Sequence, residues 1–226
     1  MNVNFEHKKL FPGNVGPPTG EMGTSMFWTG RNRLFEETLG RVEGWLAEEG
    51  YVGSIDVNCI VNAEGIHPPE LTPRFGSPTI ALQEEAMESP TGEFFHDLAH
   101  GKDPDLQVHR GYQVGVRVVL PPFPFDDPEV YDENSRDAPV VFETDDREGI
   151  HIEDARLVER QCRAAGESGM PLVVTGKGET MAEARAQAYG RIDDVTIPNT
   201  YCRDDIGRRW IEGDGDRLRT WGYLGA

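Results

Sequence analysis

The sequence contains little cysteine and no long apolar run. Its three cysteines, Cys59, Cys162 and Cys202, are odd in number and far apart, which argues against a disulfide framework and a C-x-x-C zinc site. No run approaches the roughly 18 apolar residues that a membrane span requires. The N-terminus carries no apolar signal-peptide segment. We therefore expect no membrane partner and a cytoplasmic location.

Positive charge is also scarce. Lysine occurs only at positions 8, 9, 102 and 177, and the net charge is −18. A protein that binds duplex nucleic acid needs basic patches against the phosphates, so we expect no nucleic-acid partner. The 226 residues suffice for one large domain or two small ones with a real core.

Apolar periodicity and turn residues predict a mixed fold. Helices are expected over 31–49, 91–100 and 180–192, and strands over 2–6, 112–120, 140–143, 151–157 and 171–175. The apolar stripe of the first helix is expected to be core. Helices and strands do not alternate strictly, so we predict an α+β fold. The polar breaker over 102–105 predicts a boundary between a domain of residues 1–106 and one of residues 107–226.

Residues 55–61 and 66–72 predict a β-hairpin with its turn over 62–65. Because side chains alternate along a strand, Asp56 and Asn58 share one face, as do Glu70, Thr72 and Arg74. Carboxylates and other oxygen ligands suit Mg²⁺ together with substrate phosphates. The planar arginine fork suits a phosphate or acyl-phosphate oxygen. The hairpin therefore indicates phosphoryl chemistry, and a solvated hairpin with surface charges is the alternative.

Other motifs are weaker. The loop over 11–23 is dense in glycine and proline and could bring backbone N–H groups close to a ligand, or it could be an ordinary loop. The segment 176–178 lacks P-loop spacing and is expected to be a strand-to-helix turn before a Thr180–Glu183 capping box. His96 and His100 have i, i+4 spacing, and a surface pair is favoured over a metal site.

Four motifs, in order along nearly the whole chain, resemble those of phosphoribosylamine–glycine ligase, an ATP-grasp enzyme of purine biosynthesis. His7-Lys8 followed by residues 16–23 (GPPTGEMG) is similar to D-H-K-R followed by G-P-N-T-G-G-M-G. Residues 70–78 (ELTPRFGSP) are similar to E-F-N-A-R-F-G-D-P. Residues 173–185 resemble V-T-x-x-G-x-T-x-x-E-A, and residues 203–207 resemble R-x-D-I-G.

The resemblance implies the second part of an ATP-grasp domain followed by a small β-rich C-terminal domain. It implies ATP and Mg²⁺ or Mn²⁺ as cofactors, with Glu70 bridging metal and phosphates, Thr72 in the place of an Asn ligand, and Asp56 or Asn58 as a further ligand. Arg74 would stabilise the transferring phosphoryl group. Glycine would be activated as an acyl phosphate and attacked by the amine of phosphoribosylamine. The implied substrate-binding residues are His7, Lys8, Thr19, Gly20, Glu21, Gly23 and Arg203.

The chain departs from the family pattern at three positions near the expected substrates. Glu6 replaces an Asp, Pro18 replaces an Asn, and Glu21 replaces a Gly. Family members are also longer, and their first ATP-grasp lobe precedes the D-H-K-R motif, so the resemblance implies a separately encoded N-terminal half as partner. Two alternatives remain: an ATP-grasp carboxylate–amine ligase with another amino acid or acceptor, and a non-catalytic ATP-grasp fragment acting as a binding module.

Overall fold

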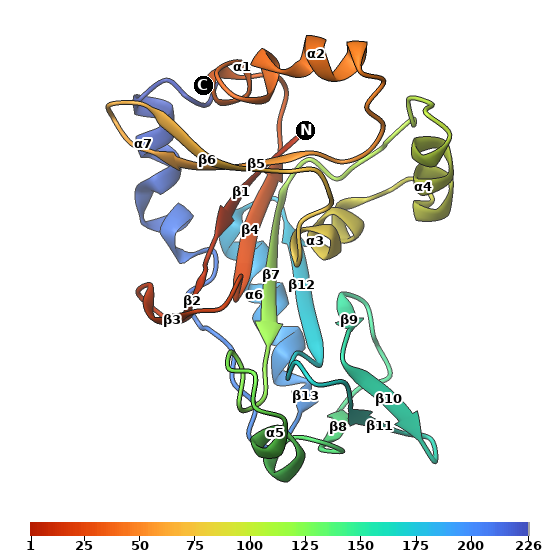
Figure 1. The fold of residues 1–226 in the computed structure, drawn as a ribbon. Coiled ribbons are helices and arrows are strands. Elements are labelled where there is room, and N and C mark those ends of the chain that lie inside the picture. The colour runs from red at the N-terminus through yellow and green to blue at the C-terminus, as the bar shows by residue number, and fades with distance from the viewer. Residues whose placement is uncertain (226) are drawn as a thin grey trace.

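In the computed structural model, which describes residues 1–225, the chain forms a five-stranded sheet, a four-stranded sheet and two two-stranded ribbons (Figure 1). The helical segments are α1 (Arg33–Glu36), η1 (Leu39–Arg41), α2 (Glu43–Glu48), α3 (Thr79–Ala86), α4 (Thr91–Ala99), α5 (Pro128–Asn134), α6 (Met181–Asp193), η2 (Trp210–Asp214) and α7 (Gly215–Thr220). The strands are β1 (Asn2–Glu6), β2 (Lys9–Phe11), β3 (Val15–Pro18), β4 (Gly23–Trp28), β5 (Asp56–Val61), β6 (Ile66–Thr72), β7 (Tyr112–Val118), β8 (Pro139–Phe142), β9 (Ile150–Ile152), β10 (Ala155–Val158), β11 (Gln161–Ala164), β12 (Leu172–Gly178) and β13 (Val195–Thr196).

The five-stranded sheet has the order β1-β4-β7-β12-β9, and each neighbouring pair is antiparallel. Two glycines let helices approach it closely. A Cβ at Gly115 of β7 would lie 2.2 Å from Leu82 Cδ1 of α3, and one at Gly176 of β12 would lie 2.4 Å from the Ala188 nitrogen of α6. Gly115 pairs with Thr175, the neighbour of Gly176, so the two glycines point to opposite faces. The sheet is therefore covered by α6 on one face and by α3 on the other.

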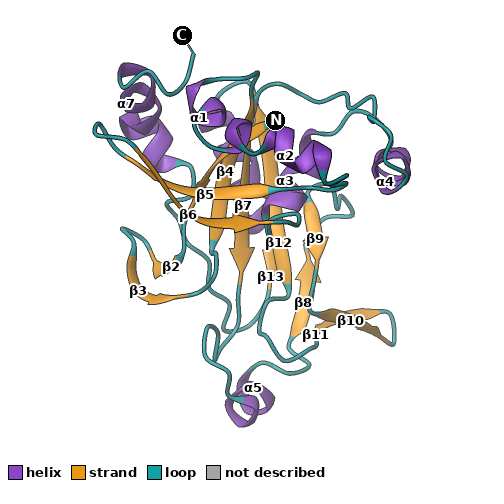
Figure 2. Cartoon of the chain, turned by 45° about the horizontal axis from the view of Figure 1, so that its top comes forward, coloured by secondary structure: helices purple, strands orange, loops and turns teal. Residues whose placement is uncertain are grey.

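The two faces differ in polarity. The face toward α6 is apolar, with Val114 and Val116 packed against Met181, Ala184 and Ala188. Period-two alternation places polar side chains on the face toward α3, namely Asn2, Asn4, Glu6, Thr24, Gln113, Arg117, Thr175 and Lys177. The hairpin β5–β6 crosses over this polar face (Figure 2). The space between hairpin and sheet is therefore lined by polar groups.

The predicted hairpin is confirmed, with β5 and β6 joined by a turn in which the Asn62 N–H donates to the Gly65 carbonyl oxygen at 3.1 Å. The predicted strand 2–6 and the helices over 91–100 and 180–192 are also confirmed. The Thr180 capping box is present: the Glu183 N–H donates to Thr180 Oγ1 at 3.2 Å, and the Thr180 N–H donates to Glu183 Oε2 at 2.9 Å. Local patterns were sufficient for these elements.

The predicted single helix over 31–49 is wrong. The segment forms α1, η1 and α2, and none of their residues is buried. Thr38 Oγ1 donates to the Leu34 carbonyl oxygen at 2.6 Å, and such a bond competes with the helical backbone pattern. Gly40 and Gly44 weaken the helix further. Trp45, expected in the core, is 58% exposed.

Several strand predictions also need correction. The strand β12 continues through Gly178, so the predicted turn over 176–178 is wrong. The predicted strand 151–157 is divided into β9 and β10. The loop over 11–23 contains β3, which pairs with β2. The helices α3, α5 and α7 and the strand β11 were not predicted.

The second sheet, with the order β10-β11-β8-β13, lies at the opposite end of the molecule from α1 and α2 (Figure 1). The five-stranded sheet takes β1 and β4 from before residue 106 and β7, β9 and β12 from after it. The division into domains 1–106 and 107–226 stays a prediction. The cysteines at 59, 162 and 202 are free. No helix within residues 1–225 is both long enough and apolar enough to cross a membrane.

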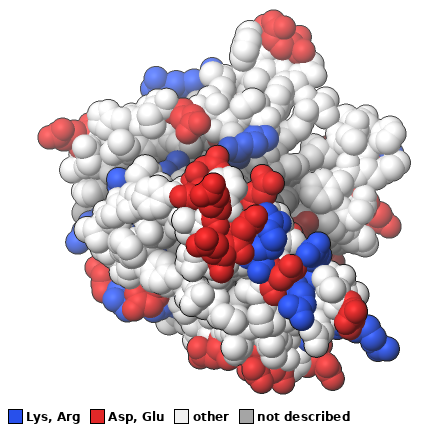
Figure 3. Space-filling view, turned by 60° about the horizontal axis from the view of Figure 1, so that its bottom comes forward, with Lys and Arg blue, Asp and Glu red and all other residues white. Residues whose placement is uncertain are grey.

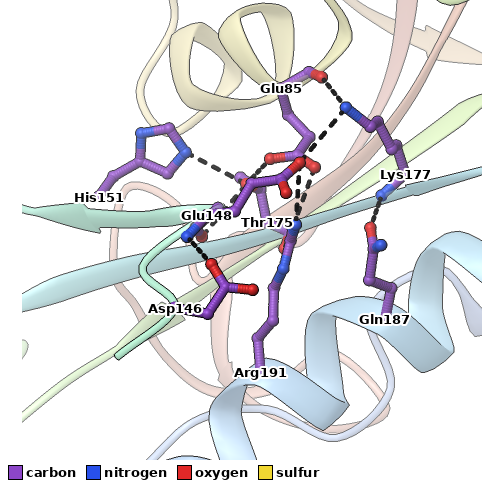
Figure 4. A network of polar contacts seen from close by, with 9 residues as sticks. Glu85, Asp146, Glu148, His151, Thr175, Lys177, Gln187 and Arg191 are labelled. Carbon is purple, nitrogen blue, oxygen red and sulfur yellow. Dashed lines mark hydrogen bonds and ion pairs between the residues drawn. The ribbon is translucent and has the colours of Figure 1, made fainter. Parts of the chain in front are cut away.

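A buried polar network fixes α3 on the sheet (Figure 4). The Glu85 side chain of α3 is only 3% exposed, and its carboxylate accepts from Arg191 Nη1 of α6 and from Thr175 Oγ1 of β12, both at 2.9 Å. Lys177 Nζ lies 3.4 Å from the Glu85 carbonyl oxygen, and His151 Nε2 lies 3.1 Å from Thr175 Oγ1. These groups together satisfy the buried charge of Glu85 and join α3 to β12 and α6.

Candidate functional site

The hairpin register brings the four predicted metal-site residues together on one face. Asp56 pairs with Thr72, and Asn58 pairs with Glu70. Directly opposed residues on antiparallel strands have neighbouring side chains. Asn58 Nδ2 donates to Glu70 Oε2 at 3.0 Å, so the amide orients one carboxylate oxygen. The predicted constellation is therefore one continuous patch of oxygen ligands.

A cavity of about 330 Å³ lies at this patch. It collects every predicted site residue except His7, Gly23 and Arg203. Its lining residues are Glu6, Lys8, Thr19, Gly20, Glu21, Asp56, Asn58, Glu70, Thr72, Arg74, Gly76, Ser77, Arg117 and Met170. The hairpin thus forms one wall, and the end of β1 with the segment before β4 forms another.

The three remaining predicted residues lie outside the lining of this cavity. His7 and Arg203 are fully buried, and the His7 N–H donates to the Gly23 carbonyl oxygen at 3.0 Å. Arg203 makes a two-pronged pair with Asp205, with both N–O distances 2.7 Å. Arg203 Nη1 also donates to the Lys9 carbonyl oxygen at 2.8 Å, so it holds the β2–β3 ribbon in place. Their direct contact with a substrate stays a prediction.

Charges of both signs meet in the cavity. Lys8 Nζ lies 2.9 Å from Glu6 Oε2. Burial alone would lower the pKa of Lys8, but the hydrogen bond and charge of Glu6 outweigh it and raise that pKa. Burial, and next the charge of Glu6, raises the pKa of Asp56. Arg74 is exposed, and the one hydrogen bond of its guanidinium within residues 1–225 runs from Nη1 to the carbonyl oxygen of Phe75, at 3.0 Å. Its guanidinium therefore retains donors for an anion.

Arg117 is a cavity residue that the sequence analysis missed. It lies on β7, is 4% exposed, and donates to the Glu21 carbonyl oxygen at 3.1 Å and to Ser77 Oγ at 2.9 Å. It also forms an ion pair with Glu153 at 2.5 Å. The signal was available in Val116-Arg117-Val118, where a charge interrupts an apolar strand. Arg117 ties the segment after Arg74 to the turn that carries Glu21.

A second cavity of about 920 Å³ adjoins the first. Glu6, Lys8, Asp56, Asn58 and Gly76 line both. Its other walls include polar residues of β1 and α3, namely Asn2, Asn4, Thr79 and Gln83. The alternation Asn2-Val3-Asn4-Phe5-Glu6 in the sequence indicates that one face of β1 is polar. The two cavities together offer room for a ligand larger than a single amino acid.

The chemistry of the hairpin residues fits a hard divalent cation. Within residues 1–225, no group of three or more Asp, Glu, His or Cys side chains could hold a metal ion by itself. Mg²⁺ is usually held by only one or two carboxylates and completes its shell with phosphates and water. Asp56 and Glu70 supply that number of carboxylates, and Asn58 and Thr72 add neutral oxygens. The patch therefore fits a metal that arrives with a phosphate ligand.

The fold has solved counterparts. A phosphoribosylamine–glycine ligase from Thermotoga maritima gives a TM-score of 0.65 at 23% identity, covering 90% of this chain and 50% of that chain. The biotin carboxylase subunit of pyruvate carboxylase gives a TM-score of 0.52 at 14% identity, covering 87% of this chain and 42% of that chain. At these identities the likeness concerns the fold. The predicted α+β fold is confirmed, and these structures share it.

The comparison of sequences finds relatives with one shared name. No protein-family model matches the chain. A phosphoribosylamine–glycine ligase from Corynebacterium ammoniagenes is 28% identical over 218 residues, which is 92% of this chain and 49% of the relative. One from Mycobacterium tuberculosis is 29% identical over 217 residues, with the same coverage of 92% and 49%. The similarity that the four motifs predicted is confirmed, and the chain spans about half the length of the curated relatives it matches.

Proposed function

We propose that the chain is the C-terminal portion of an ATP-dependent phosphoribosylamine–glycine ligase. The observation that carries the proposal is the hairpin register, which sets Asp56, Asn58, Glu70 and Thr72 on one face beside Arg74. That arrangement suits a metal–phosphate complex next to an arginine. The similarity to ligases of that name over 92% of the chain supports the same reaction class.

In the proposed reaction, Glu70 and Asp56 would hold Mg²⁺, with Asn58 and Thr72 as further oxygen ligands. The metal neutralises charge on the ATP phosphates when it is bound. Arg74 stabilises the phosphoryl group as it moves to the carboxylate of glycine, and the amine of phosphoribosylamine then displaces the phosphate to form the amide. Positioning and charge stabilisation therefore supply most of the catalysis.

The proposal includes a complementary N-terminal half, because the chain matches only about half of its relatives' length. That half would complete the nucleotide site. A cytoplasmic location belongs to the same proposal. A ligase acting on another amino acid or acceptor is the second candidate, favoured by the acidic Glu21 in the cavity.

The test is an assay of ADP formation with ATP, Mg²⁺, glycine and phosphoribosylamine. It is run on the chain alone and on the chain mixed with the N-terminal half of a matched ligase. Turnover that requires both substrates supports the proposal. Turnover with a different amino acid points to the second candidate. No ADP formation with any amino acid in the reconstituted pair contradicts ligase activity and favours a non-catalytic binding module.

Glu70→Gln tests the metal role directly. The substitution keeps the shape but removes the charge, so turnover should fall by roughly 100-fold or more. Binding of Mg²⁺ with ATP should weaken in parallel, which calorimetry measures without turnover. Glu64→Gln, at the exposed turn of the same hairpin, is the matched control and should retain wild-type activity. Equal turnover in Glu70→Gln and wild type would contradict the assignment.

A further inference from the structure

Glu21 is a buried acid in the cavity that has no ionic partner among the described side chains. The residue is 9% exposed, and its carboxylate oxygen Oε1 has no hydrogen-bond partner within residues 1–225. Burial, reinforced by the negative charge of Glu6, raises the pKa of Glu21 well above its usual value. The charges of Lys8 and Arg117 and a hydrogen bond with Thr24 offset this rise only in part. A buried carboxylate oxygen without a partner is costly, so Oε1 needs a proton or a cation.

The neighbouring charged groups already have other contacts. Lys8 pairs with Glu6 at 2.9 Å. Arg117 donates to the backbone carbonyl of Glu21, at 3.1 Å, and pairs with Glu153. The carboxylate of Glu70 accepts from Asn58 on the hairpin. Lys8 and Arg117 act on Glu21 through their charge, but within residues 1–225 they form their ion pairs with Glu6 and Glu153 and not with Glu21.

The backbone around Glu21 is held firmly. The Thr19 N–H donates to the Lys8 carbonyl oxygen at 2.9 Å, and the Met22 N–H donates to the His7 carbonyl oxygen at 2.8 Å. With the Arg117 contact, the turn is fixed on both sides of the acid. Because its backbone is already fixed, this carboxylate is preorganised and loses little entropy when it binds a ligand.

We infer that the Glu21 carboxylate binds the ammonium group of the amino acid whose carboxylate the ligase activates. This inference rests on the proposed function for the identity of the reacting end. One cavity contains the guanidinium of Arg74, which suits an anionic end, and the carboxylate of Glu21, which suits a cationic end. An α-amino acid carries both charges. A divalent metal suits Glu21 less well, because the neighbouring hairpin offers more oxygen ligands than this single carboxylate.

The inference predicts selection for a free amino group. The chain should bind glycine and methylammonium, and should bind N-acetylglycine about tenfold more weakly than glycine, because the acetyl group removes the charge. Titrations followed by NMR at millimolar ligand measure the three affinities. Failure of the wild-type chain to bind either glycine or methylammonium would overturn the inference.

The decisive variant is Glu21→Gln. Glycine affinity should fall by about tenfold, to that of N-acetylglycine, because a charge-assisted hydrogen bond is lost. Glu133→Gln on α5, an exposed acid far from the cavity, should bind as wild type does. Thermal unfolding confirms that each variant is folded, and Glu21→Gly provides a second variant if the first is not. Unchanged glycine affinity in a folded position-21 variant contradicts the inference.

Different experimental results would contradict the inference about Glu21 and the proposed function. If the reconstituted ligase turns over glycine and Glu21→Gln leaves its KM for glycine unchanged, Glu21 does not bind the ammonium group. That result would leave the proposed function intact. If no amino acid supports ADP formation but Glu21→Gln still weakens glycine binding, the ammonium site stands without the ligase reaction. Binding of Mg²⁺ with ATP should be equal in both proteins, because Glu21 lies off the hairpin.

Discussion

One buried histidine links the stability of the protein to pH. His7 is fully buried, and neither ring nitrogen has a hydrogen-bond partner within residues 1–225. Burial, and next the charge of Arg203, lowers the pKa of His7 from 6.5 to about 4. As pH falls, the unfolded chain takes up this proton near pH 6.5, whereas the folded chain takes it up only near pH 4. Stability should therefore fall between these values, by about 3 kcal/mol from this group.

His7→Gln should remove that part of the pH dependence. Urea denaturation between pH 4 and pH 7.5 gives the free energy of unfolding for both proteins, and their difference isolates the histidine from the titrating acids. His67→Gln, on the exposed side of the hairpin, should keep the wild-type decline. Parallel curves for wild type and His7→Gln would show that His7 is not held neutral in the folded state.

The site residues divide into those that local rules predict and those that they do not. Strand alternation and the turn over 62–65 predicted the hairpin and which residues share a strand face. The pairs Asp56–Thr72 and Asn58–Glu70 depend in addition on a register shift between Asn58 and Ile60, which the sequence did not predict. Arg117 and the β1 asparagines reach the cavity only because the sheet sets β7 and β1 under the hairpin, which is a long-range pairing. Alternation in the sequence indicates which face of its strand each of these residues occupies. The order of the strands in the sheet determines which other residues lie opposite that face.

At the scale of elements, the contact between α6 and β12 depends on Gly176. A Cβ at this position would lie 2.4 Å from the Ala188 nitrogen and 2.5 Å from the Ala184 oxygen, and backbone atoms cannot move aside cheaply. Gly176→Ala should therefore lower the free energy of unfolding by about 3 kcal/mol. Chemical denaturation measures the change.

Gly190 offers the matched control within α6, since a Cβ there would meet nothing within 4 Å. Gly190→Ala should raise the free energy of unfolding by about 0.5–1 kcal/mol, because alanine favours the helix. If both substitutions destabilise the protein equally, the effect at Gly176 does not come from close packing against the helix backbone.

Sequence patterns missed the helix α3 for a physical reason. The short helix α3 buries Glu85 together with Ala81, Leu82 and Ala86, so its inward face is not a continuous apolar stripe. Arg191 and Thr175, distant in sequence, make that burial tolerable. Conversely, the apolar stripe over 31–49 was regular, yet local bonding and glycines divided the segment. Periodicity predicted elements well where the partner was apolar, as for α6.

At the scale of the whole molecule, excess negative charge shapes the surface. Figure 3 shows one face on which Asp and Glu side chains gather in a band beside a smaller group of Lys and Arg. With 40 acidic and 22 basic residues, ion pairs cannot neutralise the acids. Composition gives the excess of negative charge, because charge counts do not depend on the fold, whereas the place where the acids gather depends on the fold. The cost is repulsion within the compact state.

Salt should therefore stabilise the protein. Ions screen exposed charges over about 10 Å at 0.1 M and about 3 Å at 1 M, so the repulsion weakens as NaCl rises. The free energy of unfolding from urea titrations should increase by about 1 kcal/mol or more between 0.05 M and 1 M NaCl.

A triple variant, Glu133→Lys, Glu159→Lys and Glu167→Lys, changes the net charge from −18 to −12, since each reversal adds two positive charges. It should be more stable than wild type at low salt and gain less from added salt, because less repulsion remains to be screened. Equal salt dependence in the two proteins would mean that specific ion pairs, rather than the net charge, govern the response.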